Sequence, residues 1–150
     1  MKTVNQMRLE FDAQPENESF ARVAVSAFTV PLGPTMDVLS DVRTAVSEAV
    51  TNAIVHAYGE RGGLIEVSAA LRDDGVLLLD VRDRGCGIPD VPKAMEPFFT
   101  TQPEKERSGM GFAVMQSFMD AVLVTSAVGE GTCVHMEKRV RALGGMNNEQ

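Results

Sequence analysis

Residues 35–58, TMDVLSDVRTAVSEAVTNAIVHAY, restrict the fold most, because apolar residues recur at every third or fourth position along the whole segment. This spacing predicts one long amphipathic helix that begins at Thr35 and ends near Tyr58. One face of such a helix points toward a core. The residues on this inner face are Val38, Val42, Ala45, Val46, Ala49, Ala53 and Ala57.

The chain before this helix predicts one strand and one further helix. Residues 7–13 alternate apolar and polar side chains, which is typical of a half-buried strand. Pro15 and Asn17 end that strand, and residues 17–30 then predict a helix. The residues that recur at helical spacing in it are Phe20, Val23, Ala24, Ala27 and Phe28.

The chain after the long helix consists mainly of paired strands. Residues 64–71 and 76–83 predict a hairpin, because an Asp-Gly step at Asp74 and Gly75 lies in the connection between them. A glycine- and proline-rich loop and an irregular segment over about 88–108 lead to a short helix at 110–119, and a second hairpin follows over 121–140. Because strands and helices come in blocks, we expect an α+β fold with helices packed on one face of a mostly antiparallel sheet.

Size and charge limit the class of protein. A chain of 150 residues suits a single domain, 1–150, with a frayed tail over about 140–150. The net charge of −7 argues against a nucleic-acid partner, although it permits docking onto a basic protein. No signal peptide or membrane-spanning segment is evident, and two cysteines without a pairing pattern suggest reduced thiols. We therefore expect a cytoplasmic protein without a membrane partner.

A polar stripe runs along the long helix. Glu48, Asn52 and His56 follow one another at intervals of four residues, so they lie on one side of the helix. The stripe fits a face turned toward water, and it also fits a site. Zinc is a poor candidate because asparagine is a weak zinc ligand, whereas an asparagine carbonyl suits magnesium. A carboxylate one turn away would then be placed to accept a proton from an attacking hydroxyl.

Two glycine-rich segments suggest a nucleotide. In DRGCG, Asp83 ends a strand, where its carboxylate would accept a hydrogen bond from the adenine amine but would repel the guanine carbonyl. Gly85 and Gly87 allow close approach of the backbone, although an ordinary turn uses the same residues. In RSGMGF, Gly109 and Gly111 open a helix, whose N-terminal amides and dipole favour phosphate.

Side chains around the second glycine segment would complete a phosphate site. Arg107 supplies a planar cation for a terminal phosphate. Hydroxyl groups come from Thr100, Thr101 and Ser108. The segment GEGT at 129–132 is compatible with a simple hairpin turn. The sequence contains neither a P-loop nor the motifs of ordinary protein kinases.

In order along the chain, EAVTNAIVHA, DRGCG, RSGMGF and GEGT resemble the ATP-site motifs of the family that includes gyrase, Hsp90, histidine kinases and MutL. Within this GHKL family the chain is similar to the small stand-alone anti-sigma kinases of endospore-forming bacteria. The segments that carry this resemblance are NESFARV, PTMDVLSDVRTAVSEAVTNAIVHAY and PFFTTQPEKERSGMGF, and it covers about residues 7–139. It implies a Bergerat (GHKL) two-layer α/β sandwich on a mostly antiparallel mixed sheet, with ATP or ADP and Mg²⁺ as cofactors.

The resemblance also implies roles for individual residues. Glu48 would be the general base, Asn52 the magnesium ligand and Asp83 the adenine reader. Arg107 would lie near the γ-phosphate and Thr132 near the adenine. The remaining residues implied in nucleotide binding are His56, Gly87, Ile88, Thr100, Thr101, Ser108, Gly109, Met110, Gly111 and Phe112.

Finally, the resemblance implies partners. The protein would sequester a sporulation sigma factor of the sigma-F type from RNA polymerase and phosphorylate an anti-anti-sigma factor on serine. It would form a homodimer through its first strand and helix. Arg22 is a candidate partner contact, although it also fits a solvated surface arginine. Two alternatives remain open: an anti-sigma kinase of the general-stress type, and a nucleotide-gated binding module without catalysis.

Overall fold

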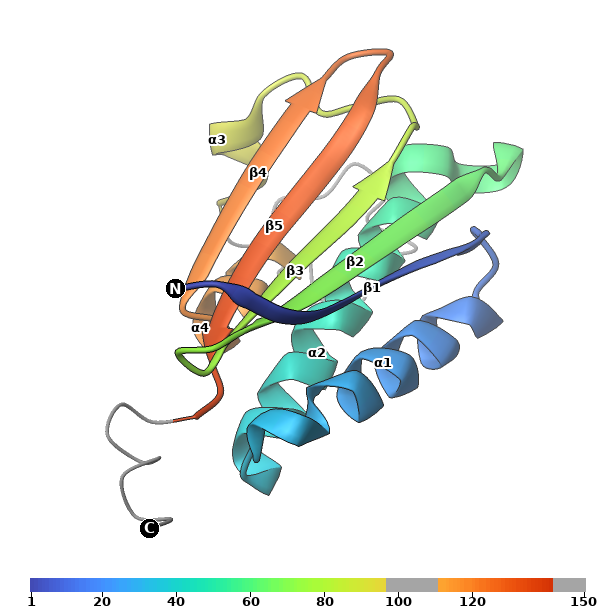
Figure 1. Ribbon diagram of the computed structural model, residues 1–150. Helices are drawn as coiled ribbons and strands as arrows, with labels where there is room; N and C mark the ends of the chain where they lie inside the picture. Colours follow the sequence, from blue (N-terminus) through green and yellow to red (C-terminus); the bar gives the residue numbers. More distant parts are fainter. Residues whose placement is uncertain (97–110, 142–150) are drawn as a thin grey trace, which may run out of the picture.

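The computed structural model describes residues 1–96 and 111–141, and its centre is a five-stranded sheet (Figure 1). The strand order is β1-β2-β3-β5-β4, and every pairing among these strands is antiparallel. The predicted α+β class is confirmed, with the hairpins where the sequence placed them. The strands are β1 Thr3–Asp12, β2 Leu64–Arg72, β3 Val76–Asp83, β4 Ala121–Ala127 and β5 Gly131–Arg139.

The main helices cover one face of this sheet and leave the other face open (Figure 1). The α-helices are α1 Glu16–Thr29, α2 Met36–Asn52, α3 Val91–Ala94 and α4 Gly111–Phe118. The Thr35 side chain accepts a hydrogen bond from the amide of Val38, 3.2 Å away, and so caps the N-terminus of α2. The short helix α3 was not predicted, since it lies in the segment expected to be irregular.

The core lies between the sheet and α2. Alternate residues of the central strands point into it, as the half-buried pattern of β2 shows. Val42, Val46 and Val50 of α2 are fully buried opposite them. The large side chains of the sheet that are fully buried are Ile65, Val67, Leu71, Leu77, Leu79 and Met136.

The long helix does not continue regularly to its predicted end. The α-helical part ends at Asn52, and Ala53–Tyr58 form a π-helical turn, followed by the 3₁₀ turn Gly59–Arg61. His56 therefore follows Asn52 within a π turn and not within the regular α-helix that the prediction assumed, whereas Glu48 and Asn52 both lie on α2.

Helix α1 turns a different face to the core than its largest apolar residues suggest. Ala21, Val25 and Thr29 are buried against the rest of the protein, whereas Phe20 and Val23 are 51% and 60% exposed. Small side chains on the inner face let α1 approach α2 closely. Phe20 and Val23 consequently form part of an outer surface, whereas Phe28 is partly buried against the core. The single-turn helix Val30–Leu32 follows α1.

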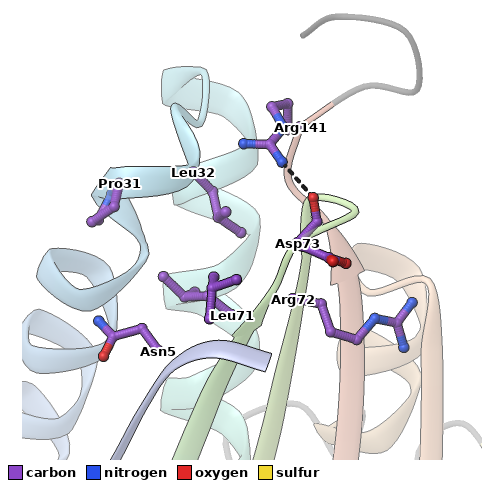
Figure 2. Close-up of a pocket in the computed structure, with 8 residues that line it drawn as sticks. Asn5, Pro31, Leu32, Leu71, Arg72, Asp73 and Arg141 are labelled. Carbon is purple, nitrogen blue, oxygen red and sulfur yellow. Dashed lines mark hydrogen bonds between the residues drawn. The ribbon is translucent and has the colours of Figure 1, made fainter. Parts of the chain in front are cut away.

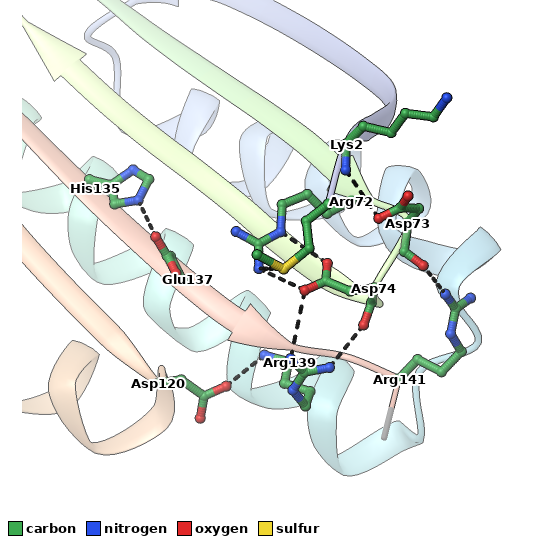
Figure 3. Close-up of polar contacts among 10 residues, drawn as sticks. Lys2, Arg72, Asp73, Asp74, Asp120, His135, Glu137, Arg139 and Arg141 are labelled. Atoms are coloured by element: carbon green, nitrogen blue, oxygen red, sulfur yellow. Dashed lines mark hydrogen bonds and ion pairs between the residues drawn. The ribbon is translucent and has the colours of Figure 1, made fainter. Parts of the chain in front are cut away.

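The open face of the sheet is polar. His135 on β5 lies 3.0 Å from Asp80 on β3 and 2.9 Å from Glu137, measured from its ring nitrogens to the carboxylate oxygens. Near the end of the same face, Arg72 and Arg139 surround Asp74 (Figure 3). The hydrogen bonds from Arg72 lower the pKa of Asp74 to about 2. Within the described part of the chain, no helix is long and apolar enough to cross a membrane.

Candidate functional site

The predicted phosphate-binding helix meets the predicted metal ligand. A Cβ atom added to Gly111, the first residue of α4, would lie 3.1 Å from both Oδ1 and Nδ2 of Asn52. Glycine therefore allows the N-terminus of α4 to approach the α2 side chain closely. Glu48 lies one turn before Asn52 on α2, and Phe112 packs partly buried against the core. The structure thus brings two of the sequence motifs together.

Asp83 is held at the end of β3 by backbone amides. Asp83 is only 7% exposed, and its Oδ1 accepts hydrogen bonds from Gly85 N at 2.9 Å and from Thr132 N at 3.2 Å. Burial raises the pKa of Asp83, and these two bonds partly oppose that rise. Within residues 1–96 and 111–141, the other oxygen, Oδ2, accepts no hydrogen bond. This oxygen is available to a ligand.

The loop after Asp83 lies between the π turn and the β4–β5 connection. The Cys86 amide donates to the carbonyl of Ala57 at 3.0 Å, and the Cys86 carbonyl accepts from Gly129 N at 2.8 Å. Gly87 has a φ of 80°, and a side chain on it would overlap the carbonyl oxygen of Ala127. Only glycine meets both conditions without strain. The predicted residue Gly87 therefore shapes this loop.

Two residues that the sequence analysis did not select fix this region. The Tyr58 hydroxyl accepts from the amide of Arg84 at 2.7 Å and donates to the carbonyl of Leu64 at 2.6 Å. It fastens the end of the π turn to the residue after Asp83. Ser126 on β4 accepts from the amide of Ile88 at 2.8 Å and lies 2.8 Å from the Thr132 hydroxyl. Neither residue belongs to a recognisable motif, so only the tertiary structure reveals them.

Other predicted residues have mixed outcomes. The main-chain carbonyl of His56 contacts the Cys86 thiol at 3.3 Å, so His56 adjoins the loop after Asp83. Thr132, on β5, is buried beside Asp83. The predicted residues that lie outside the described residues are Thr100, Thr101, Arg107, Ser108, Gly109 and Met110.

Arg22 lies on α1, away from these motifs in the sequence, and its side chain is 40% exposed. Its guanidinium lies 3.6 Å from Glu18 and donates to Ser19 at 3.2 Å. Glu18 also accepts a hydrogen bond from Ser47, the neighbour of Glu48 on α2. Arg22 is therefore a partly exposed surface residue that contacts its neighbours on α1, and its role as a partner contact remains a prediction.

The cavities of the described residues do not by themselves define the site. One cavity of about 300 Å³ is lined by Asp83, Ser126 and Thr132 among others, beside the β4–β5 connection. Another, of about 480 Å³, lies beside Leu71 and Asp73 where β2 ends, and none of the predicted site residues lines it (Figure 2). We place the site by hydrogen-bonding chemistry and not by volume, because phosphates bind at exposed amides as well as in deep cavities.

The donor groups fit magnesium better than a transition metal. No group of three or more His, Cys, Asp or Glu side chains suited to a metal exists in residues 1–96 and 111–141. The predicted ligand is the amide oxygen of Asn52, which lies beside the N-terminus of α4. Magnesium commonly takes one or two protein oxygens and completes its shell with phosphate oxygens and water.

Comparison with known proteins places the chain in a family. The sequence matches the histidine kinase-like ATPase domain over residues 11–138. An anti-sigma F factor from Geobacillus kaustophilus (strain HTA426) is 54% identical over 137 residues, which are 91% of this chain and 93% of that protein. An anti-sigma F factor from Pasteuria penetrans is 51% identical over 92% of this chain and 93% of that protein.

Solved structures show the same fold. The RsbU and RsbW domains of Rv1364c from Mycobacterium tuberculosis align over 91% of this chain and 33% of that one, with a TM-score of 0.67 and 21% identity. Full-length ShkA in complex with AMPPNP aligns over 95% of this chain and 33% of that one, with a TM-score of 0.58 and 20% identity. The chain belongs to the histidine kinase-like ATPase domain family and, within it, to the anti-sigma F factors.

Proposed function

We propose that this protein is an ATP-dependent serine kinase that also sequesters a sigma factor of the sigma-F type in the cytoplasm. The observation that carries the proposal is the meeting of Asn52 on α2 with Gly111 at the start of α4. The free oxygen of Asp83 supplies the second anchor for a nucleotide. Relatives that are 50–54% identical over most of the chain bear the name anti-sigma F factor, which supports the binding partner.

Asp83 would select adenine at one end of the nucleotide. Its Oδ2 accepts a hydrogen bond from the exocyclic amine, while Oδ1 stays bonded to the amides of Gly85 and Thr132. A guanine base would place its carbonyl oxygen against this carboxylate, and two acceptors repel each other. Such a contact would give Oδ2 of the buried Asp83 a hydrogen-bond donor, which would offset part of the cost of its desolvation.

At the other end, the phosphates would lie at the start of α4. The amides of Gly109, Met110 and Gly111 would donate to phosphate oxygens, and Arg107 would add a cation beside the γ-phosphate. Asn52 would hold Mg²⁺, which supplies charge neutralisation to the phosphates when bound. We also assign His56, Thr100, Thr101, Ser108 and Phe112 to the surroundings of the nucleotide.

Glu48 would act as the general base. It lies one helical turn from Asn52, so it adjoins the end of the nucleotide at which transfer takes place. The serine hydroxyl of the anti-anti-sigma factor gives its proton to the Glu48 carboxylate as its oxygen bonds to the γ-phosphorus, and the bond from that phosphorus to ADP breaks. A pure nucleotide-gated binding module would have no need of this carboxylate.

The proposed reaction is tested by incubating the protein with γ-labelled ATP, Mg²⁺ and candidate anti-anti-sigma factors. We expect label on a serine of one antagonist, and none when every serine of that antagonist is replaced by alanine. Tight binding of a sigma factor without label on any antagonist would favour the binding module and would overturn the kinase.

The affinity for ADP should depend on pH in a way that identifies Asp83. Only the carboxylate form accepts from the adenine amine, and burial raises the pKa of Asp83. Affinity should therefore be constant above that raised pKa and fall as the pH falls through it, sooner than for an exposed aspartate. Titration calorimetry at a series of pH values measures this, and Asp83→Asn supplies the control because it keeps only the pH dependence of the phosphates.

We also propose a homodimer formed by β1 and α1. β1 is an edge strand, and the neighbouring surface of α1 exposes Phe20 and Val23, which favours association with a second copy. Val23→Glu should turn the dimer into a monomer in light-scattering measurements. Val128→Glu, at a residue 67% exposed between β4 and β5, is the matched control and should stay dimeric. A monomeric wild-type protein at high concentration would contradict this assembly.

A further inference from the structure

The hydroxyl of Ser126 stands at the centre of a small hydrogen-bond network behind the adenine end of the site. Its Oγ lies 2.8 Å from the amide nitrogen of Ile88, 3.0 Å from the carbonyl oxygen of Gly131 and 2.8 Å from the hydroxyl of Thr132. The network joins β4, β5 and the loop after Asp83. Thr132 also donates its main-chain amide to Asp83, so Ser126 and Asp83 act on the same residue.

The hydrogen-bond donors and acceptors of this network allow two arrangements. The Ile88 amide is always a donor and the Gly131 carbonyl always an acceptor, while Ser126 and Thr132 each bring one proton. In the first arrangement the Ser126 hydroxyl donates to the carbonyl of Gly131, and the Thr132 hydroxyl donates to Ser126. In the second, the Ser126 hydroxyl donates to Thr132, so the Thr132 hydroxyl is available to donate to a ligand. The residue that decides between them is Ser126.

We infer that Ser126 is a specificity-determining positioning residue, which makes the Thr132 hydroxyl a hydrogen-bond donor to the purine. This inference rests on the proposed adenine site at Asp83. With nucleotide bound, all three hydrogen bonds are donated in the same direction. The Ile88 amide donates to Ser126, Ser126 donates to Thr132, and Thr132 donates to the base. Each bond in such a chain polarises the next, so Ser126 strengthens the donor at its end.

An acceptor at Asp83 and a donor at Thr132 complement adenine at two adjacent positions of the base and are mismatched with guanine at both. Adenine presents an amine to Asp83 and, beside it, the ring acceptor N1 to Thr132. Guanine presents a carbonyl to the carboxylate and an N–H group to a hydroxyl that already donates. A site that leaves polar groups mismatched discriminates more strongly than one that differs only in shape. Ser126 thus adds a second adenine-reading position without touching the base itself.

The test compares ADP, GDP and 1-deaza-ADP, an analogue that keeps the amine but lacks the N1 acceptor. Ser126→Ala should weaken ADP binding roughly three- to tenfold and lower the preference for ADP over GDP by a similar factor. Binding of 1-deaza-ADP should change less than about twofold. Equal weakening of ADP and 1-deaza-ADP would show that Ser126 only supports the loop, and would overturn the inference.

Further variants separate this role from general damage. In a Thr132→Val background, Ser126→Ala should cause no additional loss of ADP affinity. Ser126→Cys, which keeps the shape and weakens the hydrogen bonds, replaces the alanine variant if that one does not fold. Thr29→Val removes a buried hydroxyl from α1 and should leave all three affinities unchanged. If Asp83→Asn leaves ADP affinity unaltered, the adenine site itself fails, a result distinct from failure at Ser126.

Discussion

Replacing Glu48 by Gln should slow phosphoryl transfer to the antagonist by about 100- to 10,000-fold while ATP still binds within a few-fold of its normal affinity. Glutamine preserves the size of the side chain but cannot take the proton of the attacking serine. Binding survives because the adenine and phosphate contacts come from other elements. Single-turnover assays with labelled ATP measure the rate, and calorimetry measures the affinity.

A matched control for this substitution is Glu60→Gln, which changes an exposed glutamate just beyond the π turn. It removes the same charge and should transfer phosphate at the normal rate. Full transfer by the Glu48 variant would reduce Glu48 to a structural residue. Loss of both binding and transfer would instead assign Glu48 to the nucleotide pocket.

Asp83→Asn should weaken ATP and ADP binding about ten- to a hundredfold, because a charge-assisted hydrogen bond is worth about 1.5–3 kcal/mol. The asparagine oxygen can still accept from the amides of Gly85 and Thr132, so the local fold should persist. The side-chain amide nitrogen of the asparagine would then face the adenine amine. Both groups are donors, so no hydrogen bond forms between them. Titration with ADP gives the loss directly.

The same substitution should raise the stability of the nucleotide-free protein at neutral pH. The pKa of Asp83 is raised on folding by burial, so its contribution to stability is complete below the unfolded pKa and is lost as the pH rises through the folded one. Asparagine has no charge to bury. The melting temperature of Asp83→Asn should therefore exceed that of the wild-type protein by an amount that grows as the pH rises through the folded pKa of Asp83.

Asp80→Asn makes the same change on the opposite face of β3, where Asp80 contacts His135. It should leave ADP binding unaltered, and an equal loss of affinity there would mean that the effect of Asp83→Asn is only electrostatic at long range.

Hydrophobic periodicity was enough to predict most of the fold. The apolar spacing in 35–58 and the alternation in 7–13 identified α2 and β1, and Val42, Val46 and Val50 are buried as an inward face requires. The face of α1 could not be predicted in this way. Its large residues Phe20 and Val23 face outward because the packing against α2 favours small side chains, a requirement set by the partner helix.

The candidate site was predictable only as separate motifs. Nothing in the spacing of Asn52 and Gly111 shows that they meet, since their contact depends on how α4 packs on α2. The π turn after Asn52 was missed because helical periodicity does not distinguish it from a regular turn. Tyr58 and Ser126 act through long-range hydrogen bonds, and such contacts leave no local pattern in a sequence.

The central claim is that one nucleotide is held at once by Asp83, Asn52 and the start of α4. A crystal structure of the protein with ADP and Mg²⁺ tests it most directly. We predict Oδ2 of Asp83 at about 3 Å from the purine amine and the amide oxygen of Asn52 at about 2.1 Å from the metal. A purine bound away from Asp83, or a metal bound without Asn52, would contradict the account.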